Sequence, residues 1–417
     1  MADSAVKDAS LAGAGRLNIE YAERNMPALM AIRGRFAKEK PFRGLTVGLA
    51  LHVTKETAAL VRTLVSGGAK VAIAGCNPLS TQDDVAAALA EEGVSVYAKK
   101  GETKEEYYDY LGRVIGHGPH ITIDDGCDLV SALHTDKKYE SGLARVIGGC
   151  EETTTGVIRL RAMERDGALK YPVIAVNDNK TKHLLDNYYG TGQSTIDGIL
   201  RATNTLIAGK CFVVCGYGDC GKGVALRARG MGANVVVTET DAFRALQASL
   251  DGFRVMPISA AAETGDIFLT VTGDKHVIRM EHMERMKDGA ILANSGHFDI
   301  EIDVAALDKL KKRRIRPFLD EYMVGGKRVY LCAEGRLVNL GAAEGHPSEV
   351  MATSFAGQAL ACEFLVKNRG KLKAGVHVLP GGIDDAIARL QLDAMGIGID
   401  SLTKEQKEYL SGWKEGT

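Results

Sequence analysis

The sequence predicts an α/β protein with two doubly wound domains and a short C-terminal helical segment. Short β-branched runs alternate with helical patterns along nearly the whole chain, which is typical of parallel strands joined by helices. A chain of 417 residues is also too long for one compact core. A second and sharper alternating series begins near residue 193. We therefore expect two domains, each built around a parallel sheet.

The order of the elements suggests a discontinuous first domain. Its predicted strands are the runs at 45–51, 70–75, 94–98, 121–126 and 172–178, with helices between them. The residues after 344 return to helical patterns and follow a finished unit, so we expect them to pack against the first domain. The expected parts are a first domain of residues 1–180 and 348–395, a second of 193–344, and a C-terminal segment of 396–417 with a short capped helix and an exposed tail. The chain crosses between the domains at 177–193 and 340–350, which we expect to act as hinges.

The composition excludes several classes of partner. Charged residues make up 25% and the formal net charge is −1, so there is no electrostatic reason to expect nucleic acid or an anionic membrane. The basic run at 309–314 alternates with apolar positions, which predicts the exposed face of a helix rather than a phosphate-binding surface. The N-terminal residues lack the apolar stretch of a signal peptide, and no window resembles a membrane span. We expect a cytoplasmic protein.

The cysteines suggest neither a disulfide framework nor a metal site. All eight lie outside any CxxC or His/Cys knuckle, and several lie in apolar runs, where a thiol behaves as a small hydrophobe. The sequence also lacks HExxH and calcium-loop patterns. We therefore predict no bound metal.

The glycines of "CFVVCGYGDCGKG" indicate a Rossmann dinucleotide-binding domain. Gly216, Gly218 and Gly221 form GxGxxG directly between a predicted strand and a predicted helix. Gly216 permits the tight turn, Gly218 lets backbone N–H groups approach a pyrophosphate, and Gly221 allows close helix–strand packing. The next strand ends on Glu239, whose carboxylate can bind both ribose hydroxyls and repel a 2′-phosphate. This combination predicts NAD rather than NADP.

Other polar residues follow predicted strands, where ligands bind in open α/β sheets. His52, Asp125 and His297 each occupy such a position. Taken singly, a histidine there is more often a loop residue, a pair of aspartates is usually a solvated turn, and "EETTTG" at 151–156 could be an ordinary helix start.

Lys182 and Asp186 are a further candidate pair. They are four residues apart, so on a helix they point the same way. On this stretch alone a surface ion pair is the simpler interpretation. If the pair is buried, Asp186 could orient a lysine that takes a proton from a hydroxyl.

The ordered motifs resemble one family closely, the S-adenosyl-L-homocysteine hydrolases. The matching stretches run from about residue 16 to 410 and are "LHVTKET", "CNPLSTQDD", "DDGCDL", "EETTTG", "VNDNKTKHLLDN", "GYGDCGKG", "VTETD", "SGHFDIEID", "AEGRLVNLGAAEGHP" and "GVHVLP". The resemblance implies one NAD per subunit that stays bound, because the hydride taken from the substrate is returned in the same turnover. It also implies a homotetramer.

The resemblance assigns roles by position. Lys182 and Asp186 would contact the ribose 3′-hydroxyl, with Lys182 as its base. Glu152 would bind the 2′-hydroxyl. Asp125, with His52 and His297, would handle the C4′ proton, the leaving thiolate and the attacking water, in a division left open. The residues that would read the adenine edge are Thr54, Glu56 and His346. The residues that would contact NAD are Thr153, Thr154, Thr155, Asn187, Gly216, Gly218, Asp219, Cys220, Gly221, Lys222, Gly223, Glu239, Arg244, Ser295, Gly296, His297 and Asn339.

The chain departs from the family pattern at several positions. Thr191 stands where many members have cysteine, and Arg244 where many have asparagine near the ribose acid. Glu344 replaces an apolar residue close to the expected base pocket. The sequence also ends without the "KPDHYRY" tail that in many members reaches the NAD of a neighbouring subunit, so NAD would be held less tightly.

Three other functions fit parts of the pattern. An S-inosyl-L-homocysteine hydrolase would keep the mechanism and change the base; Glu56 favours adenine, whereas Glu344 weakens that inference. An ordinary NAD dehydrogenase would release its oxidised product and accumulate NADH. A non-catalytic NAD-binding regulator would not need the intact set of His52, Asp125, Glu152, Lys182, Asp186 and His297.

Overall fold

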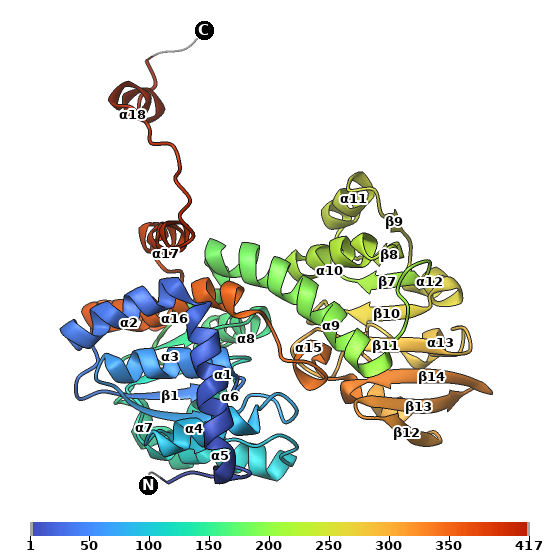
Figure 1. The fold of residues 1–417 in the computed structure, drawn as a ribbon, viewed down its shortest axis with the longest axis horizontal. Coiled ribbons are helices and arrows are strands. Elements are labelled where there is room, and N and C mark those ends of the chain that lie inside the picture. The colour runs from blue at the N-terminus through green and yellow to red at the C-terminus, as the bar shows by residue number, and fades with distance from the viewer. Residues whose placement is uncertain (1–2, 415–417) are drawn as a thin grey trace.

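The computed structural model describes residues 3–414 as two sheet-centred units that lie side by side. Figure 1 shows the first unit in blue and cyan, the second in yellow and orange, and the long green helix α9 (Thr191–Thr203) between them. The fold class predicted from the alternating pattern is confirmed. The domain limits given above stay a prediction.

The first unit is built on a seven-stranded parallel sheet with the order β15-β6-β5-β4-β1-β2-β3. Its strands are β1 (Thr46–Ala50), β2 (Lys70–Ala74), β3 (Ser95–Tyr97), β4 (Ile121–Asp124), β5 (Gly148–Glu151), β6 (Pro172–Ala175) and β15 (Gly375–His377). Strand β15 comes from the C-terminal part of the chain and pairs with β6 at the sheet edge. The C-terminal part of the chain therefore returns to the first sheet.

Helices cover both faces of this sheet. They are α1 (Ala12–Arg24), α2 (Pro27–Glu39), α3 (Lys55–Ser66), α4 (Asp83–Glu91), α5 (Lys104–Gly116), α6 (Asp128–Thr135), α7 (Glu140–Leu143), α8 (Thr154–Arg165), α16 (Ser348–Lys367) and α17 (Gly381–Ala394), with short 3-10 turns η1 (Ala9–Leu11) and η2 (Lys137–Tyr139). Helix α16 is buried along most of its length, and its apolar residues join those of α2, α3 and β1 in one core. Within residues 3–414, no helix combines the length and apolar character needed to cross a bilayer.

The second unit contains an eight-stranded sheet with the order β12-β13-β14-β11-β10-β7-β8-β9. Its strands are β7 (Cys211–Cys215), β8 (Asn234–Thr238), β9 (Arg254–Val255), β10 (Ile267–Thr270), β11 (Ala290–Asn294), β12 (Lys312–Arg316), β13 (Leu319–Val324) and β14 (Lys327–Cys332). The pairings among β9, β8, β7, β10, β11 and β14 are parallel, whereas β12 and β13 add an antiparallel edge. Apolar clusters line both faces of the parallel part.

The helices of the second unit lie around this sheet. They are α10 (Asp219–Gly230), α11 (Ala242–Leu250), α12 (Ile258–Thr264), α13 (Met280–Met283), α14 (Val304–Leu307) and α15 (Val338–Gly341), with a 3-10 turn η5 (Ala333–Gly335).

The interpretation of the basic run at 309–314 as a helix face is wrong. Helix α14 ends at Leu307, and the run continues into β12, a fully exposed edge strand. Arg313 pairs with Glu321 across the hairpin, and Arg314 pairs with Asp320. Charged side chains on an edge strand discourage pairing with other chains, which accounts for the composition of the run.

The C-terminal segment leads away from the body of the protein. Figure 1 shows α18 (Lys404–Ser411) beyond α17 and separated from both units. Thr403 and Gln406 form a capping box at its start, so the predicted capped helix is confirmed. The end of the predicted tail lies outside the described residues.

Two segments join the units. The first runs through the 3-10 turn η3 (Val176–Asp178) and a π-helix, η4 (Thr181–Gly190), into α9. The second runs from α15 into α16. Gly223 of α10 fits against the backbone of Tyr188 so closely that a side chain there would collide with the Tyr188 carbonyl. This contact locks η4 onto the glycine-rich turn.

We expect Gly223→Ala to destabilise the protein by about 1–3 kcal/mol, because the added methyl must displace backbone. Gly230→Ala, on the same helix, is the matched control: nothing lies within 4 Å of its methyl. It should be neutral or stabilise by up to about 1 kcal/mol. Thermal unfolding at a fixed NAD concentration measures both. Equal melting temperatures for the two variants would contradict the packing described here.

Candidate active site

The predicted site residues gather in two cavities between the units. The residues proposed to touch substrate line the first cavity, and they are His52, Thr54, Glu56, Asp125, Glu152, Lys182, Asp186, His297 and His346. Most of the residues proposed to touch NAD line the second cavity. Thr153, Asn187, Cys220, Ser295 and His297 line both. A ligand in one cavity therefore lies next to a ligand in the other.

Lys182 is buried between two carboxylates. Its Nζ lies 2.7 Å from Asp186 Oδ2 and 3.4 Å from Glu152 Oε1, and it donates to Asn187 Oδ1 at 2.9 Å. Lys182 is only 6% exposed and Asp186 is fully buried, so the interpretation as a surface ion pair is wrong. Because η4 is a π-helix, in which hydrogen bonds join residues five apart, 186 and 187 both lie over 182.

The charges of this group determine its protonation. Burial disfavours the charged Lys182, but Asp186 and Glu152 outweigh it and raise the pKa of Lys182 above its ordinary value. Burial acts on Asp186 too, yet Lys182 and His346 hold the pKa of Asp186 below its usual range. Lys182 is thus an ammonium and Asp186 a carboxylate.

Glu152 is held from the opposite side by α16. Ser354 Oγ donates to Glu152 Oε1 at 2.6 Å, and Gln358 Nε2 donates to Oε2. Burial raises the pKa of Glu152, although Lys182 opposes the shift. A carboxyl with fixed donors and a raised pKa is well suited to accept a hydrogen bond from a ligand hydroxyl.

Asp125 lies between two histidines. Its Oδ2 is 3.4 Å from His52 Nε2, and its Oδ1 is 3.4 Å from His297 Nδ1. His52 follows β1, and Asp125 follows the neighbouring strand β4. His297 comes from the second unit and packs against Gly126 of the first unit so tightly that any side chain at 126 would collide with its ring. Asp125 alone would raise the pKa of His52, but burial of the ring has the larger effect and lowers this pKa to about 4. The imidazole of His52 is therefore neutral at pH 7.

The far end of the first cavity contains Glu56. Ser348 Oγ donates to Glu56 Oε1 at 2.6 Å, and Lys55 Nζ lies 3.3 Å from the same oxygen. Both contacts are made to Oε1 of this buried carboxylate, which forms part of the cavity wall. Thr54 caps α3, since its side chain accepts from the Thr57 backbone N–H.

Glu344 lies at the mouth of this cavity and links the two units. Its carboxylate is 3.2 Å from Lys55 Nζ of the first unit and 3.1 Å from Arg201 Nη1 of α9. Burial alone would raise the pKa of Glu344, but these two cations outweigh that effect and lower it. The Glu344 side chain is 57% exposed, so added salt would weaken its ion pairs with Lys55 and Arg201.

The second cavity fits a dinucleotide. Gly216 has φ +111°, in the left-handed region that glycine tolerates, and Gly221 lies against its carbonyl with no room for a side chain. Gly218 caps α10 and faces open space, the nearest atom to an added methyl being Arg244 Nη1 at 3.8 Å. A helix start with free N–H groups and no side chain in front of them suits a pyrophosphate.

Glu239 is positioned for a ribose. Its Oε2 accepts from the Tyr217 backbone N–H at 2.8 Å, and its Oε1 accepts from the Thr240 N–H at 2.7 Å. These bonds fix the carboxylate directly after β8, beside the turn. Arg244 also lines the cavity. The residues present thus fit NAD.

Some predicted contacts lie elsewhere. Thr153, Thr154, Thr155, Asn187, Gly216, Gly218, Asp219, Cys220, Glu239, Arg244, Ser295, Gly296 and His297 line the second cavity. Asn339 lines the first cavity instead and donates to Ser194 Oγ at 3.1 Å. Gly221, Lys222 and Gly223 are absent from the walls that the described residues form around either cavity, and the two glycines serve packing. Thr191 lines the first cavity, 3.2 Å from His346 Nε2.

The segment after β10 is a wall that the sequence argument missed. Residues 271–277 line the second cavity. Buried Glu301 holds them, accepting from the Thr272 N–H at 2.9 Å and the Gly273 N–H at 2.8 Å. The run "DIFLT" could have indicated this wall. It forms β10, which pairs in parallel with β7, so the residues after both strands lie at the same edge of the sheet.

The fold and the two adjoining cavities define a two-domain α/β enzyme with NAD beside a polar reaction site. The family model "S-adenosyl-L-homocysteine hydrolase, NAD binding domain" matches residues 187–345, and "S-adenosyl-L-homocysteine hydrolase" matches residues 3–141. The chain belongs to the S-adenosyl-L-homocysteine hydrolase family.

Relatives of two kinds are similar over the full length. An adenosylhomocysteinase of Saccharolobus solfataricus is 62% identical over 416 residues, covering 99% of each chain. An S-inosyl-L-homocysteine hydrolase of Methanocaldococcus jannaschii is 59% identical over 414 residues, also covering 99% of each. Among solved structures, a dipicolinate synthase chain from Bacillus halodurans has a TM-score of 0.50 at 14% identity, covering 78% of this chain and 99% of that one. That likeness concerns the fold alone.

We expect Glu239→Gln to lower the ratio of the NADP Kd to the NAD Kd by about tenfold or more. The amide no longer repels a 2′-phosphate, and Arg244 remains beside it. Calorimetric titration of the NAD-stripped protein with each dinucleotide measures the ratio. Glu263→Gln, an exposed change on α12, is the control. If the ratio stayed unchanged in Glu239→Gln, the carboxylate would not face the ribose.

Proposed function

We propose that the protein catalyses the reversible hydrolysis of S-adenosyl-L-homocysteine to adenosine and L-homocysteine, through the side chains of the first cavity. One observation supports this most strongly: His52, Asp125, Glu152, Lys182, Asp186 and His297 all line one cavity that shares a wall with the dinucleotide cavity. Bound NAD supplies the temporary oxidation of the ribose 3′-hydroxyl, which makes the adjacent C4′ proton acidic.

Lys182 and Glu152 would position the ribose. Lys182 Nζ and Glu152 Oε1 are 3.4 Å apart, so adjacent hydroxyls of one sugar can reach both. Lys182 is an ammonium in this structure and must lose its proton before it can act as a base. Asp186, which contacts both Lys182 Nζ at 2.7 Å and His346 Nδ1 at 2.5 Å, provides a path for that proton.

His52, Asp125 and His297 would carry the protons of the elimination and the water addition. Neutral His52 can accept a proton, and Asp125 contacts both rings. Either histidine can therefore exchange a proton with Asp125 without a large movement. Because His297 belongs to the second unit, the group is complete only when the units are closed together.

Glu56 would read the base. Its carboxylate can accept from the exocyclic amine of adenine, whereas it would face the carbonyl oxygen of hypoxanthine with like charge. This observation favours S-adenosyl- over S-inosyl-homocysteine. The S-inosyl activity remains the second candidate, because relatives of both kinds are about equally similar.

Two finer features belong to this proposal. The homotetramer is inferred from family resemblance, and the cytoplasmic location from the sequence. A non-catalytic regulator is disfavoured by the complete polar set in the first cavity. The deciding assay follows homocysteine release while monitoring NADH: a dehydrogenase accumulates NADH, a regulator releases no homocysteine, and the hydrolase releases homocysteine without NADH. Heat-denaturing the purified protein should release NAD.

Lys182→Ala should retain most bound NAD but abolish its reduction by added adenosine, because the group facing the 3′-hydroxyl is gone. We expect turnover to fall by at least about a hundredfold. Lys180→Ala, two residues earlier and exposed, is the matched control and should behave as wild type. Absorbance of NADH after mixing with adenosine reports the step. Normal turnover in Lys182→Ala would refute the assignment.

Glu56→Gln should shift the preference toward the inosyl substrate. The glutamine amide can donate to the hypoxanthine carbonyl, which the carboxylate cannot. We expect the ratio of kcat/KM for the adenosyl over the inosyl substrate to fall by about tenfold or more. Glu349→Gln, an exposed glutamate of α16, is the control. A ratio that did not move would mean that another residue reads the base.

A further inference from the structure

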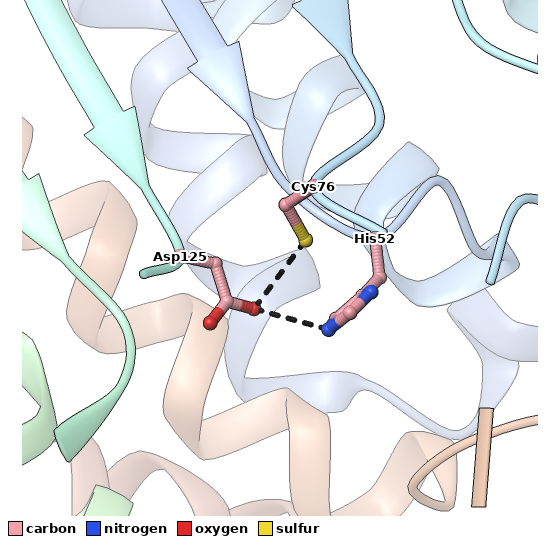
Figure 2. Close-up of side chains that lie close together, drawn as sticks. All are labelled: His52, Cys76 and Asp125. Atoms are coloured by element: carbon pink, nitrogen blue, oxygen red, sulfur yellow. Dashed lines mark hydrogen bonds and ion pairs between the residues drawn. The ribbon is translucent and has the colours of Figure 1, made fainter. Parts of the chain in front are cut away.

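Glu151, at the end of β5, is a fully buried acid that the proposed mechanism does not use. The next residue, Glu152, lines the first cavity. Across the sheet Glu151 pairs with Asp124, the last residue of β4, and Asp125 follows directly. Figure 2 shows Asp125 beyond that strand end, with its carboxylate directed at His52. Glu151 therefore lies behind the two loops that carry reacting acids.

One oxygen of Glu151 holds both of these loops. Glu151 Oε1 accepts from the Gly126 backbone N–H at 2.8 Å and from the Thr153 backbone N–H at 3.1 Å. Gly126 directly follows Asp125, and Thr153 directly follows Glu152. The same atom thus fixes the peptide next to each acid. Neither loop can shift relative to the other without stretching one of these two hydrogen bonds.

The loop after β4 needs such a contact because its backbone is strained. Gly126 has φ +107° and Cys127 has φ 66°, so two successive residues have positive φ and the second is not a glycine. A conformation of this kind persists only where the surroundings determine it. Arg159 of α8 donates to the Gly126 carbonyl, and Glu151 accepts from the Gly126 N–H. The Gly126 residue is therefore held through both of its backbone polar groups.

The fold reserves space for the Glu151 carboxyl group. Gly156, in the first turn of α8, lies so close that a methyl group there would collide with this carboxyl. Burial, together with the charges of Asp124 and Asp125, raises the pKa of Glu151 well above its ordinary value. Oε2 has no hydrogen-bond partner among residues 3–414. The neutral form can carry its hydrogen on Oε2 and keep Oε1 as the acceptor for both N–H groups.

We propose that Glu151 is a positioning residue, whose Oε1 fixes the backbone beside Asp125 and Glu152 so that both acids reach one sugar. This role rests on the proposed function. Glu151 is absent from the walls that the described residues form around either cavity, so it acts through its neighbours and touches no ligand. It supplies an acceptor at a fixed place, and neither a charge nor a proton is required of it.

Two variants separate the place of the acceptor from the charge of the side chain. Glu151→Gln keeps a carbonyl oxygen at the same reach but cannot ionise, whereas Glu151→Asp keeps the acid and withdraws its oxygens by one methylene. We expect kcat to stay within about threefold of wild type in Glu151→Gln and to fall by about a hundredfold in Glu151→Asp, because a shift of about 1 Å can lower a rate that much. The KM should change little, since Glu56 at the far end of the cavity is untouched.

A second readout separates positioning from lost stability. In deuterated water, the group around Asp125 should exchange the C4′ hydrogen of added adenosine, which NMR can follow on holoenzyme of matched NAD content. Glu151→Asp should slow this exchange in parallel with kcat, and Glu151→Gln should not. Cys150→Ala, which changes the preceding and fully buried residue of β5, is the matched control. It should lower the melting temperature and leave both rates as in wild type.

The outcomes are decisive in both directions. A hundredfold loss in Glu151→Gln, or wild-type rates in Glu151→Asp, would overturn the proposal. Wild-type protein supplies a further test if Glu151→Asp fails to fold, because the bonded Gly126 and Thr153 amides should exchange their hydrogens slowly. Rapid exchange at either amide would overturn the proposal as well.

The same experiments distinguish this proposal from the proposed function. Wild-type protein that releases no homocysteine, while the Gly126 and Thr153 amides remain protected, would reject the function and leave the clamp on the two loops. Homocysteine release that Glu151→Asp does not slow would uphold the function and reject the positioning role.

Discussion

The burial of Lys182 between two carboxylates is the constraint on which the site depends. An ammonium without partners in the interior costs several kcal/mol, so the chain must bring Asp186 and Glu152 to it. Asp186 comes from the same π-helix and Glu152 from the end of β5, so the ion group fastens the crossing segment to the first sheet. The π-helical register satisfies Lys182 by placing residues 186 and 187 over it. The type of helix and the position of the crossing segment thus have one cause.

The two sheets contribute to one site because the carboxyl ends of their strands face each other. Where the units meet, close approach requires residues without side chains: Gly126 admits the ring of His297, and Gly223 admits the backbone of Tyr188. Gly126 lies outside the chemistry, but its lack of a side chain leaves room for the His297 ring beside Asp125. The bridge of Glu344 to Lys55 and Arg201 acts on the same boundary more weakly, since it is exposed.

The sequence predicted the parts of the structure that follow from local patterns. Residues directly after β-branched runs, such as His52 and Asp125, lie at the sheet edge because parallel strands leave them there. The burial of Lys182 could not be predicted, since a lysine four residues before an aspartate has the same pattern on a surface and in a core. The strand form of the run at 309–314 depends on β13, a partner further along the chain, so the local pattern gave the wrong element.

The acids of the first cavity differ in how close their hydrogen-bonding and charged partners lie. Glu56 accepts from Ser348 at 2.6 Å, Glu152 accepts from Ser354 at 2.6 Å, and Asp186 contacts Lys182 at 2.7 Å. Each of these has a close partner that fixes its orientation. The side-chain partners of Asp125 stand further off, at 3.4 and 3.9 Å, and none is a permanent cation. Asp125 is therefore the least tightly paired of these four acids. Incomplete pairing suits the proton-carrying role proposed for Asp125, because a carboxylate held by a close cation accepts a proton less readily.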